Sequence, residues 1–291
     1  MNEPAKMISV IIPTLAEARR STSLLRAIDS ILSQEDVRAI PIVVVNGNRF
    51  DPLLVERLKH LGIKLHMEAI GDLINALVVG RRLVETPYFS FLDDDDEYFP
   101  HALRVRLTPM LTDMDIDVVV SNGYRFDGEV RSASAKNISN ARQDPILALL
   151  ENNWLTSCGG LYRTERIDSK FFADATKYAE WTYLAFKICL SYRIAFVDNP
   201  SYVINDTEGS LSKSVNYNAA LAGIMERILD LPLPPHARRA VRRKYGSALH
   251  DLSSHCLETQ ERKKALQLHL KSLCQPGGLR FILYSRKFLG G

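Results

Sequence analysis

The sequence predicts an α/β fold: a mixed, mainly parallel sheet with helices on both faces, followed by a C-terminal helical extension. Short apolar segments alternate with helix-period segments over the first 120 residues, which is typical of β-α-β units. These apolar segments are almost uninterrupted, as expected for strands of a parallel sheet covered on both faces. After about residue 214 only helical periodicity remains, so we expect the chain to end in helices.

Each element follows from its own pattern. Residues 7–13 (MISVIIP) and 40–45 (IPIVVV) are rich in β-branched apolar residues and predict two buried strands. Residues 19–33 carry apolar side chains at helical spacing and predict a helix between them. The later predictions are strands over 63–66, 88–92, 117–121, 155–163 and 193–197, a hairpin over 124–131, and helices over 72–84 and 178–190.

The pattern divides the chain into two parts. Residues 1–213 are expected to form the α/β domain, with a nucleotide-binding half over about 1–121 and an acceptor half over about 122–213. Residues 214–291 are expected to form the helical extension, which the Leu-Pro-Leu-Pro-Pro segment at 231–235 interrupts. Ligands of such sheets bind beyond the carboxyl ends of the strands, so the first part is where we expect the site.

Composition excludes several classes of protein. Hydrophobic residues make up 46% and charged residues 24% of the 291, which is typical of a globular chain and not of a disordered or fibrous one. No apolar run approaches the roughly 20 residues of a spanning helix, and the N-terminus does not resemble a signal peptide. We therefore expect a cytoplasmic protein.

Charge is distributed unevenly. From residue 236 to the end there are twelve Lys or Arg and three acids, a net charge of +9, which leaves −6 for the first 235 residues. The segment 277–291 (GGLRFILYSRKFLGG) combines basic with large apolar residues. Such a segment suits peripheral contact with the anionic inner face of a cell membrane, or docking on its own domain or on the partner in a homodimer. The sequence leaves these alternatives open.

Four aspartates and a glutamate, Asp93 to Glu97, follow directly after the apolar segment YFSFL. Adjacent carboxylates at a strand end repel one another unless a cation neutralises them. Carboxylate oxygens suit Mg²⁺ or Mn²⁺, which proteins commonly hold with few carboxylates together with substrate phosphates. The run therefore predicts a divalent-cation site, and the alternative is an acidic loop that caps the next helix.

The order of several motifs resembles the nucleotide-sugar glycosyltransferases of family 2, which have the GT-A fold. The segment SVIIPT at 9–14 with Glu17 resembles that family's first strand and nucleotide-binding turn, and VVVNGN at 43–48 resembles its second. YFSFLDDDD at 88–96 resembles its DxD motif, and Tyr178-Ala179-Glu180-Trp181 its Glu-Asp-Trp segment. The resemblance covers about residues 7–212.

The resemblance implies a set of site residues. Glu180 falls on the position of the base that deprotonates the acceptor hydroxyl; its alternative role is an acid in the first turn of a helix. Asp93 and Asp95 would hold the metal, with Asp206 as a late ligand. The nucleotide would contact Pro13, Thr14, Leu15, Glu17, Asn46, Asn75, Asp93 and Asp94. The acceptor would contact Trp154, Gly159, Gly160 and Trp181.

Three positions depart from the family pattern. Asn46 stands where the family has Asp, so uridine is favoured weakly; Ala179 precedes the base; and Asn205-Asp206 replaces the usual metal-binding His. We expect an inverting, metal-dependent glycosyltransferase that moves a sugar from a nucleotide-diphosphate donor, UDP-sugar by preference, to a saccharide or lipid-linked hydroxyl. Its product would belong to cell-surface polysaccharide or glycolipid, and no nucleic acid is expected as a partner. The alternatives are an inactive binding or assembly module with the same fold and, less favoured, a sugar nucleotidyltransferase, which would normally have a glycine-rich loop after its first strand.

Overall fold

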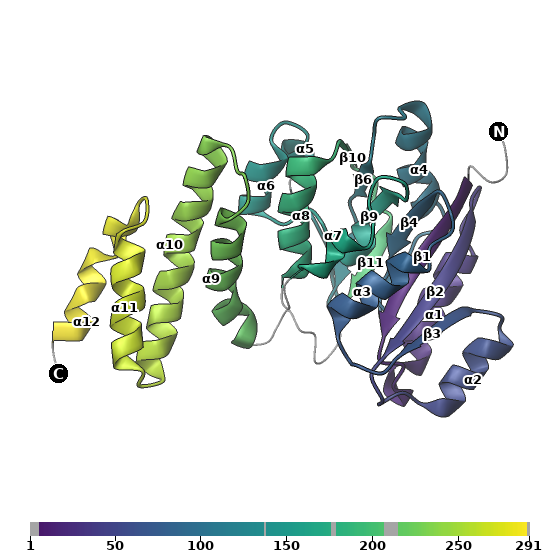
Figure 1. Ribbon diagram of the computed structural model, residues 1–291, viewed down its shortest axis with the longest axis horizontal. Helices are drawn as coiled ribbons and strands as arrows, with labels where there is room; N and C mark the ends of the chain where they lie inside the picture. Colours follow the sequence, from purple (N-terminus) through teal and green to yellow (C-terminus); the bar gives the residue numbers. More distant parts are fainter. Residues whose placement is uncertain (1–5, 137, 176–178, 207–214, 290–291) are drawn as a thin grey trace.

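The computed structural model describes residues 6–136, 138–175, 179–206 and 215–289, and its elements are shown in Figure 1. Among these residues, seven strands form the main sheet in the order β10-β6-β9-β4-β1-β2-β3. Their bounds are β1 Met7–Thr14, β2 Arg38–Asn46, β3 Lys64–Glu68, β4 Tyr88–Phe91, β6 Val118–Ser121, β9 Gly160–Arg163 and β10 Ile194–Val197. Within the described sheet β9 runs antiparallel to both neighbours and the other pairings are parallel, which confirms the predicted fold class.

Alternating side chains of the central strands feed two separate cores. In β2, Ile42 and Val44 face one core, whereas Val43 and Val45 face the other, because successive side chains of a strand point to opposite faces. The core that contains Val43 is covered by α1 (Ser21–Leu32), α2 (Pro52–His60) and α4 (Ala102–Thr112). The opposite core is covered by α3 (Leu73–Arg82), α6 (Pro145–Glu151), α7 (Lys170–Ala173) and α8 (Glu180–Ser191).

The structure corrects several element boundaries. The helix expected over 19–33 is a 3₁₀ turn, η2 (Ala18–Arg20), followed by α1. The strand expected over 155–163 is shorter, because residues 157–159 form the 3₁₀ turn η3 (Ser157–Gly159) before β9. Helix α8 begins at Glu180, and residue 178 lies outside the described residues.

Several elements were not given bounds by the sequence prediction: helices α2 and α4, the short helices α5 (Ile138–Ala141), α6 and α7, and a second sheet. Helix α2 begins with an Asp51 cap and a proline, and α4 contains Pro109, which weakened its helical pattern. In the described part of the chain, a smaller sheet pairs four short strands in the order β5-β11-β7-β8. They are β5 (Glu97–Tyr98), β11 (Tyr202–Asn205) and the two strands of the predicted hairpin, β7 (Tyr124–Phe126) and β8 (Arg131–Ala133). Strand β5 begins directly after Asp96 and pairs with β11, so this sheet brings the end of β11 close to the acidic run.

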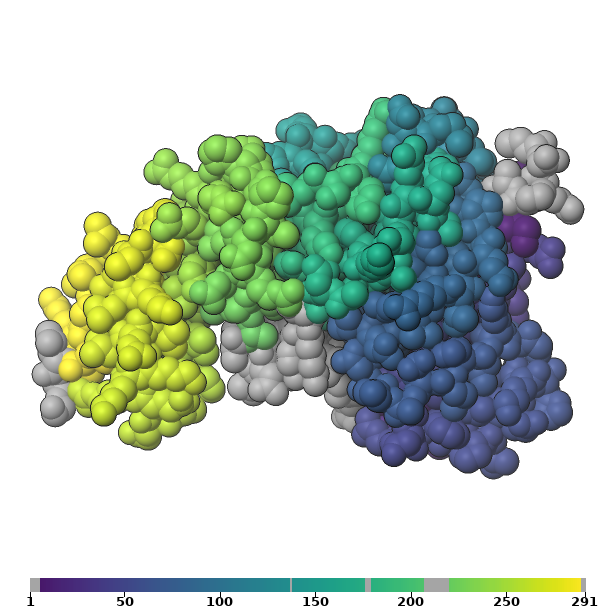
Figure 2. All heavy atoms as spheres, viewed as in Figure 1, coloured from purple at the N-terminus to yellow at the C-terminus, as the bar shows by residue number. Residues whose placement is uncertain are grey.

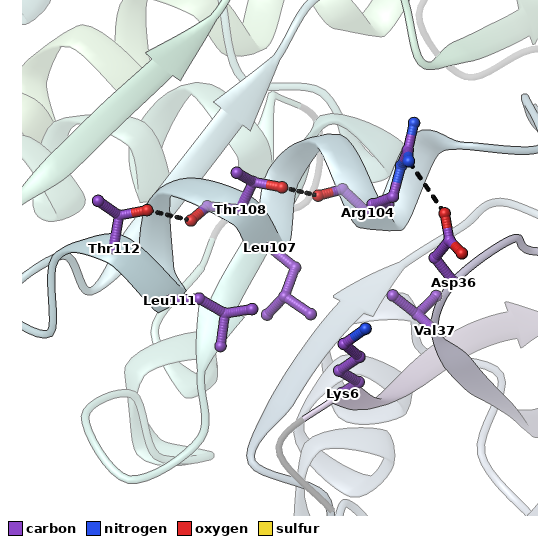
Figure 3. Close-up of a pocket in the computed structure, with 8 residues that line it drawn as sticks. All are labelled: Lys6, Asp36, Val37, Arg104, Leu107, Thr108, Leu111 and Thr112. Atoms are coloured by element: carbon purple, nitrogen blue, oxygen red, sulfur yellow. Dashed lines mark hydrogen bonds and ion pairs between the residues drawn. The ribbon is translucent and has the colours of Figure 1, made fainter. Parts of the chain in front are cut away.

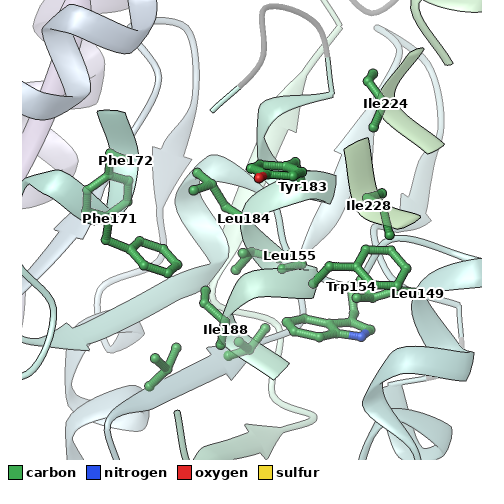
Figure 4. Close-up of a cluster of buried hydrophobic side chains, with 14 of the residues drawn as sticks. Leu149, Trp154, Leu155, Phe171, Phe172, Tyr183, Leu184, Ile188, Ile224 and Ile228 are labelled. Atoms are coloured by element: carbon green, nitrogen blue, oxygen red, sulfur yellow. The ribbon is translucent and has the colours of Figure 1, made fainter. Parts of the chain in front are cut away.

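The predicted helical extension consists of α9 (Val215–Leu229), α10 (Pro235–Glu258), α11 (Arg262–Leu273), the 3₁₀ segment η5 (Gly278–Ser285) and α12 (Arg286–Leu289). It leads away from the sheet to the far end of the molecule (Figures 1 and 2). Helix α9 packs on the α/β part, where Ile224 and Ile228 lie in the same core as Tyr183 and Trp154 (Figure 4). The boundary predicted at residue 213 lies outside the described residues and stays a prediction.

The end of the extension docks on its own helices with one face. The ring of Phe281 stacks on that of His250 with centroids 3.9 Å apart, and Tyr284 accepts a hydrogen bond from Ser254 at 2.7 Å. A 3₁₀ helix repeats every three residues, so Phe281 and Tyr284 share this inward face. The remaining aliphatic side chains point outward, with exposed fractions of 73% for Leu279 and 67% for Leu283. In the described residues, no helix is long and apolar enough to cross a membrane.

Candidate active site

The acidic run lies where the carboxyl ends of β1 and β4 meet. The two strands pair in parallel, with Ile11 opposite Phe91, and the backbone N–H of Leu92 donates to the Ile11 carbonyl at 3.0 Å. The next residues turn away from the sheet, and the Asp96 N–H donates back to the Asp93 carbonyl at 3.2 Å. We call residues 93–96 the acidic loop. Its position is the one at which parallel sheets bind ligands.

Asp93 and Asp94 are held by hydroxyl groups from two other segments. The Ser157 hydroxyl donates to Asp93 Oδ2 at 2.7 Å, and the Thr14 hydroxyl donates to Asp94 Oδ2 at 2.5 Å. Burial raises the pKa of Asp93 to about 7; the Ser157 hydrogen bond opposes this, and the negative charges of Asp95, Asp94 and Glu180 add to it. Asp93 is therefore a carboxylate that a nearby cation would stabilise strongly.

The guanidinium of Arg20 bridges two carboxylates of the acidic loop, those of Asp94 and Asp95. Nη1 of Arg20 lies 3.2 Å from Asp94 Oδ1 and 2.6 Å from Asp95 Oδ2. A second arginine, Arg26, contacts the loop backbone at the Asp95 carbonyl, at 3.3 Å. The acidic loop is thus partly neutralised by the protein itself.

Asp96 has a structural role. Its side chain is 2% exposed, and Oδ1 accepts from the backbone N–H of Asn205 at 3.0 Å. The Asn205 side-chain amide donates to the Asp95 carbonyl at 2.7 Å. Burial raises the pKa of Asp96 well above its ordinary value, and the thiol of Cys158 lies 3.7 Å from its other oxygen. Asp96 therefore ties β11 to the acidic loop.

The residues predicted on the nucleotide side lie at the carboxyl ends of β1 and β2 and in the first turn of α3. Asn46 is 6% exposed, and its side-chain amide donates to the Thr14 carbonyl at 3.0 Å. Asn75 donates to Glu68 Oε2 at 3.0 Å. Gly47 has a φ of +95°, and a Cβ there would lie 3.2 Å from the Gly71 backbone, so only glycine fits this turn well.

The first turn after β1 completes this side. Pro13 pairs with Val44 within the sheet, and Ala16, after Leu15, adopts a φ of +49° while its N–H donates to the Thr14 hydroxyl at 2.8 Å. Glu17 then forms ion pairs with Arg19 at 2.6 Å and Arg49 at 3.3 Å. The Arg19 hydrogen bond lowers the pKa of Glu17, against a smaller opposing effect of burial. The turn therefore presents a charged carboxylate.

Glu180 is the first residue of α8. Ala179 before it has a left-handed backbone, with φ of +51°, which turns the chain into the helix. Burial raises the pKa of Glu180 above its ordinary value. The next side chain, Trp181, packs edge-on against Phe91 with ring centroids 5.4 Å apart, two residues before Asp93. The fold thus brings Glu180 to the acidic loop across almost ninety residues of sequence.

Comparison with known proteins identifies the family. The sequence profile described as Glycosyl transferase family 2 matches residues 9–171, more than half of the chain. The chain belongs to this family. A comparison with curated proteins gave no match.

The fold of this glycosyltransferase is shared with S. aureus TarS. A crystal structure of TarS 1–349 in complex with UDP-GlcNAc matches with a TM-score of 0.63 and 17% identity, covering 97% of this chain and 91% of that chain. The complex of the same TarS fragment with UDP matches with a TM-score of 0.59 and 15% identity over the same shares. These likenesses establish the GT-A fold predicted from the sequence.

Three of the four residues predicted on the acceptor side of the glycosyltransferase need correction. Trp154 is 1% exposed, its indole N–H donates to the Pro145 carbonyl at 2.9 Å, and its ring packs in the core of Figure 4. A Cβ on Gly160 would lie 2.4 Å from the Tyr162 hydroxyl, and one on Gly159 would lie 3.0 Å from Thr156 Oγ1. These residues are small or apolar because of core packing. Trp181, which is partly exposed, stays a candidate acceptor contact.

Two residues of the site, Arg20 and Ser157, are not predicted from the sequence. They contact the acidic loop from positions 75 and 64 residues away, and no local pattern marks such contacts. Asn205, next to the predicted late metal ligand Asp206, donates from its side-chain amide to the loop backbone instead. Asp206 is exposed at the end of β11, and its N–H donates to the Phe126 carbonyl at 2.8 Å.

A separate cavity lies at the opposite edge of the sheet. Its volume is about 400 Å³, and Lys6, Val37 and Leu107 are among its lining residues (Figure 3). Lys6 and Val37 precede β1 and β2, so the cavity is at the amino ends of these strands. An ion pair of 2.9 Å between Arg104 and Asp36 closes one side. Nothing of the predicted chemistry lies there.

Proposed function

We propose that this glycosyltransferase moves a sugar from a UDP-sugar to an acceptor hydroxyl, with inversion at the anomeric carbon and with Mn²⁺ or Mg²⁺ as cofactor. Family membership supports the reaction class. The acidic loop at the carboxyl ends of β1 and β4, facing Glu180, is the observation that carries the proposal. The TarS complex with UDP-GlcNAc, on the same fold, supports a uridine donor.

The donor would lie along the ends of β1, β2 and β4. Asn46 and Asn75 would face the nucleobase side, where their amides can donate or accept. Asp93 and Asp94 would face the ribose and diphosphate. The remaining proposed contacts are Pro13, Thr14, Leu15 and Glu17.

The carboxylates of the acidic loop fit a divalent cation whose remaining ligands come from the phosphates of the donor. Within the described residues no group of three or more His, Cys, Asp or Glu side chains could hold a metal by itself. Asp93 and Asp95 offer hard oxygen ligands, and Mg²⁺ is commonly held by one or two carboxylates together with substrate phosphates. When bound, the cation supplies charge neutralisation for the leaving diphosphate. Asp206 stays a predicted late ligand.

Glu180 would act as the base. Its carboxylate takes the proton of the acceptor hydroxyl while that oxygen forms a bond to the anomeric carbon and the bond to the diphosphate oxygen breaks. The nucleoside diphosphate leaves with the electron pair, so a single displacement inverts the configuration. The raised pKa of Glu180 brings it closer to neutral pH, which makes proton transfer to it more favourable.

The acceptor is a saccharide or a lipid-linked hydroxyl, and we propose peripheral contact of η5 with an anionic membrane. Phe281 and Tyr284 dock on α10, whereas Leu279, Ile282 and Leu283 are 50–73% exposed beside Arg280 and Arg286. Apolar and basic side chains on one face suit a lipid surface. Replacing Leu279 and Leu283 with Glu should abolish flotation with vesicles containing phosphatidylglycerol; unchanged flotation contradicts this contact.

The test of the proposed reaction compares Glu180→Gln with wild type in a transfer assay with UDP-sugars and Mn²⁺. We expect transfer to fall by roughly 10² to 10⁴ while UDP binding is kept, because a base of this kind contributes about that factor. Glu165→Gln is the matched control, because Glu165 is 69% exposed on a loop after β9. Wild-type transfer by Glu180→Gln would remove the base assignment, and UDP binding without any transfer by wild type would favour a binding module.

A further inference from the structure

The positive charge of Arg20 lies against two carboxylates of the acidic loop. Its Nη1 contacts a carboxylate oxygen of both Asp94 and Asp95, at 3.2 and 2.6 Å. The side chain is 23% exposed, and the two carboxylates are 13% and 16% exposed. A charge-assisted hydrogen bond in such a half-buried place is stronger than one at the open surface.

A divalent cation and this guanidinium compete for the same oxygens. A Mg²⁺ ion would bind a carboxylate oxygen at about 2.1 Å, whereas Arg20 Nη1 is 2.6 Å from Asp95 Oδ2. Positive charges a few ångströms apart repel, more strongly in a half-buried place than in open water, and a divalent ion doubles the repulsion of a unit charge. The loop therefore accommodates one of the two cations at a time at these atoms.

We propose that Arg20 is the internal counter-ion of the donor site, which holds Asp94 and Asp95 in the metal-free protein and is displaced when a divalent cation binds with the nucleotide. This inference rests on the proposed function, because it assigns the acidic loop to a divalent cation. It predicts that metal binds weakly before the donor and strongly with it, since the diphosphate adds ligands and offers the released guanidinium a new partner.

The backbone around Arg20 allows this movement. The Arg20 N–H donates to the Glu17 carbonyl at 2.8 Å, and its own carbonyl accepts from the Ser23 hydroxyl at 3.0 Å. These bonds fix the main chain at the start of α1. The side chain is long and partly exposed, so its guanidinium can leave the carboxylates without a change in the fold.

The experiment measures Mn²⁺ affinity in the absence of nucleotide, by the loss of the free-ion electron paramagnetic resonance signal. We expect Arg20→Gln to bind Mn²⁺ at least about tenfold more tightly than wild type, and Arg20→Lys to be intermediate because the ammonium keeps the charge but not the planar fork. Arg19→Gln is the matched control. It removes an equal charge one residue away, from an arginine that pairs with Glu17 and is 67% exposed, and its Mn²⁺ affinity should stay within about twofold of wild type.

Equal Mn²⁺ affinity in wild type and Arg20→Gln would overturn the proposal, as would the same gain in Arg19→Gln. If Arg20→Gln does not fold, as judged by circular dichroism, Arg20→Lys and isotope-labelled arginine in wild type decide instead. The Arg20 guanidinium resonance should shift when Mg²⁺ and UDP are added together, and an unchanged resonance contradicts displacement. Failure of wild type to bind UDP would refute the proposed function, whereas UDP binding with no gain in Arg20→Gln would refute this inference alone.

Discussion

The hydroxyl of Ser157 donates a 2.7 Å hydrogen bond to Asp93 and so joins the turn before β9 to the loop after β4. β9 is the strand that runs antiparallel to β4, so the bond joins two segments that are 64 residues apart in the sequence and neighbours in the sheet. It also favours the charged form of a carboxylate whose pKa burial raises to about 7. The geometry makes Ser157 a support of the proposed metal ligand.

Replacing Ser157 with Ala should weaken binding of UDP with Mn²⁺ by roughly 10- to 100-fold, because a hydrogen bond to a charged group contributes about 1.5–3 kcal/mol. Isothermal titration calorimetry at pH 7.5 measures the change. Ser33→Ala, at an exposed position after α1, should bind as wild type does. Unchanged affinity in Ser157→Ala would show that Asp93 does not depend on this hydroxyl.

Asn46 should not tolerate replacement by aspartate. Its amide donates to the Thr14 carbonyl at 3.0 Å, and a carboxylate would place two acceptors against each other in a buried position. We expect Asn46→Asp to lower the free energy of unfolding by about 1–3 kcal/mol, measured by urea denaturation. Asn48→Asp, which is exposed, should change it by less than about 0.5 kcal/mol. Equal stabilities for the two variants would contradict the assigned hydrogen bond.

Gly160 should be required by the core. A Cβ there would lie 2.4 Å from the Tyr162 hydroxyl, and the Tyr162 ring is fixed by stacking on Phe89 with centroids 5.0 Å apart. Gly160→Ala should destabilise the protein by about 1–3 kcal/mol. Gly223→Ala is the control: it lies in α9 with open space around it and should be neutral or stabilising by up to about 1 kcal/mol. An unchanged melting temperature in Gly160→Ala would refute the packing argument.

Acid should destabilise the C-terminal helices α10 and α11. Burial lowers the pKa of His250 and of His269 below their ordinary value of 6.5, so the fold favours both neutral rings. The unfolded chain takes up protons near pH 6.5 and the folded chain only at lower pH, so stability is full above about pH 6.5 and falls as the pH drops through the folded pKa values. Hydrogen exchange in α10 and α11 should therefore accelerate between pH 7.5 and 5.5, after correction for the intrinsic rate.

The variant His250→Phe keeps a ring that can stack on Phe281 and removes one titrating group, so its loss of protection should be smaller. His60→Gln, at a ring that is 78% exposed, should behave as wild type. Protection that does not depend on pH in the wild-type protein would contradict the neutral state of His250 and His269 in the folded protein.

The sequence predicted the parts of the molecule that local patterns encode. The nearly uninterrupted apolar runs of β1 and β2, the spacing in α1 and the acidic loop after β4 all follow from consecutive residues. Helix α4 escaped prediction because Pro109 interrupts its pattern, yet its first two turns supply the fully buried Arg106, which bonds to Ser121 at 2.8 Å and Ser201 at 2.9 Å. Those contacts form only when distant strands come together.

The site divides in the same way. Asp93 and Glu180 are predicted because their motifs resemble those of a family, and the fold places them close enough for the charge of Glu180 to raise the pKa of Asp93. The family resemblance puts the segment of Trp154 on the acceptor side, but burial is a property of the whole core and the ring lies inside it. Arg20 is not predicted, because nothing in its own segment shows that it contacts Asp95, 75 residues later.

The most direct test of the account is a calorimetric titration of wild type and Asp95→Ala with a panel of nucleoside diphosphates, each with and without Mn²⁺. The account predicts that wild type binds UDP at least about tenfold more tightly with Mn²⁺ than without it, and that Asp95→Ala loses this difference. Binding that is equal with and without Mn²⁺, or no binding of any nucleoside diphosphate, would contradict the assignment of the acidic loop to a metal-bound donor.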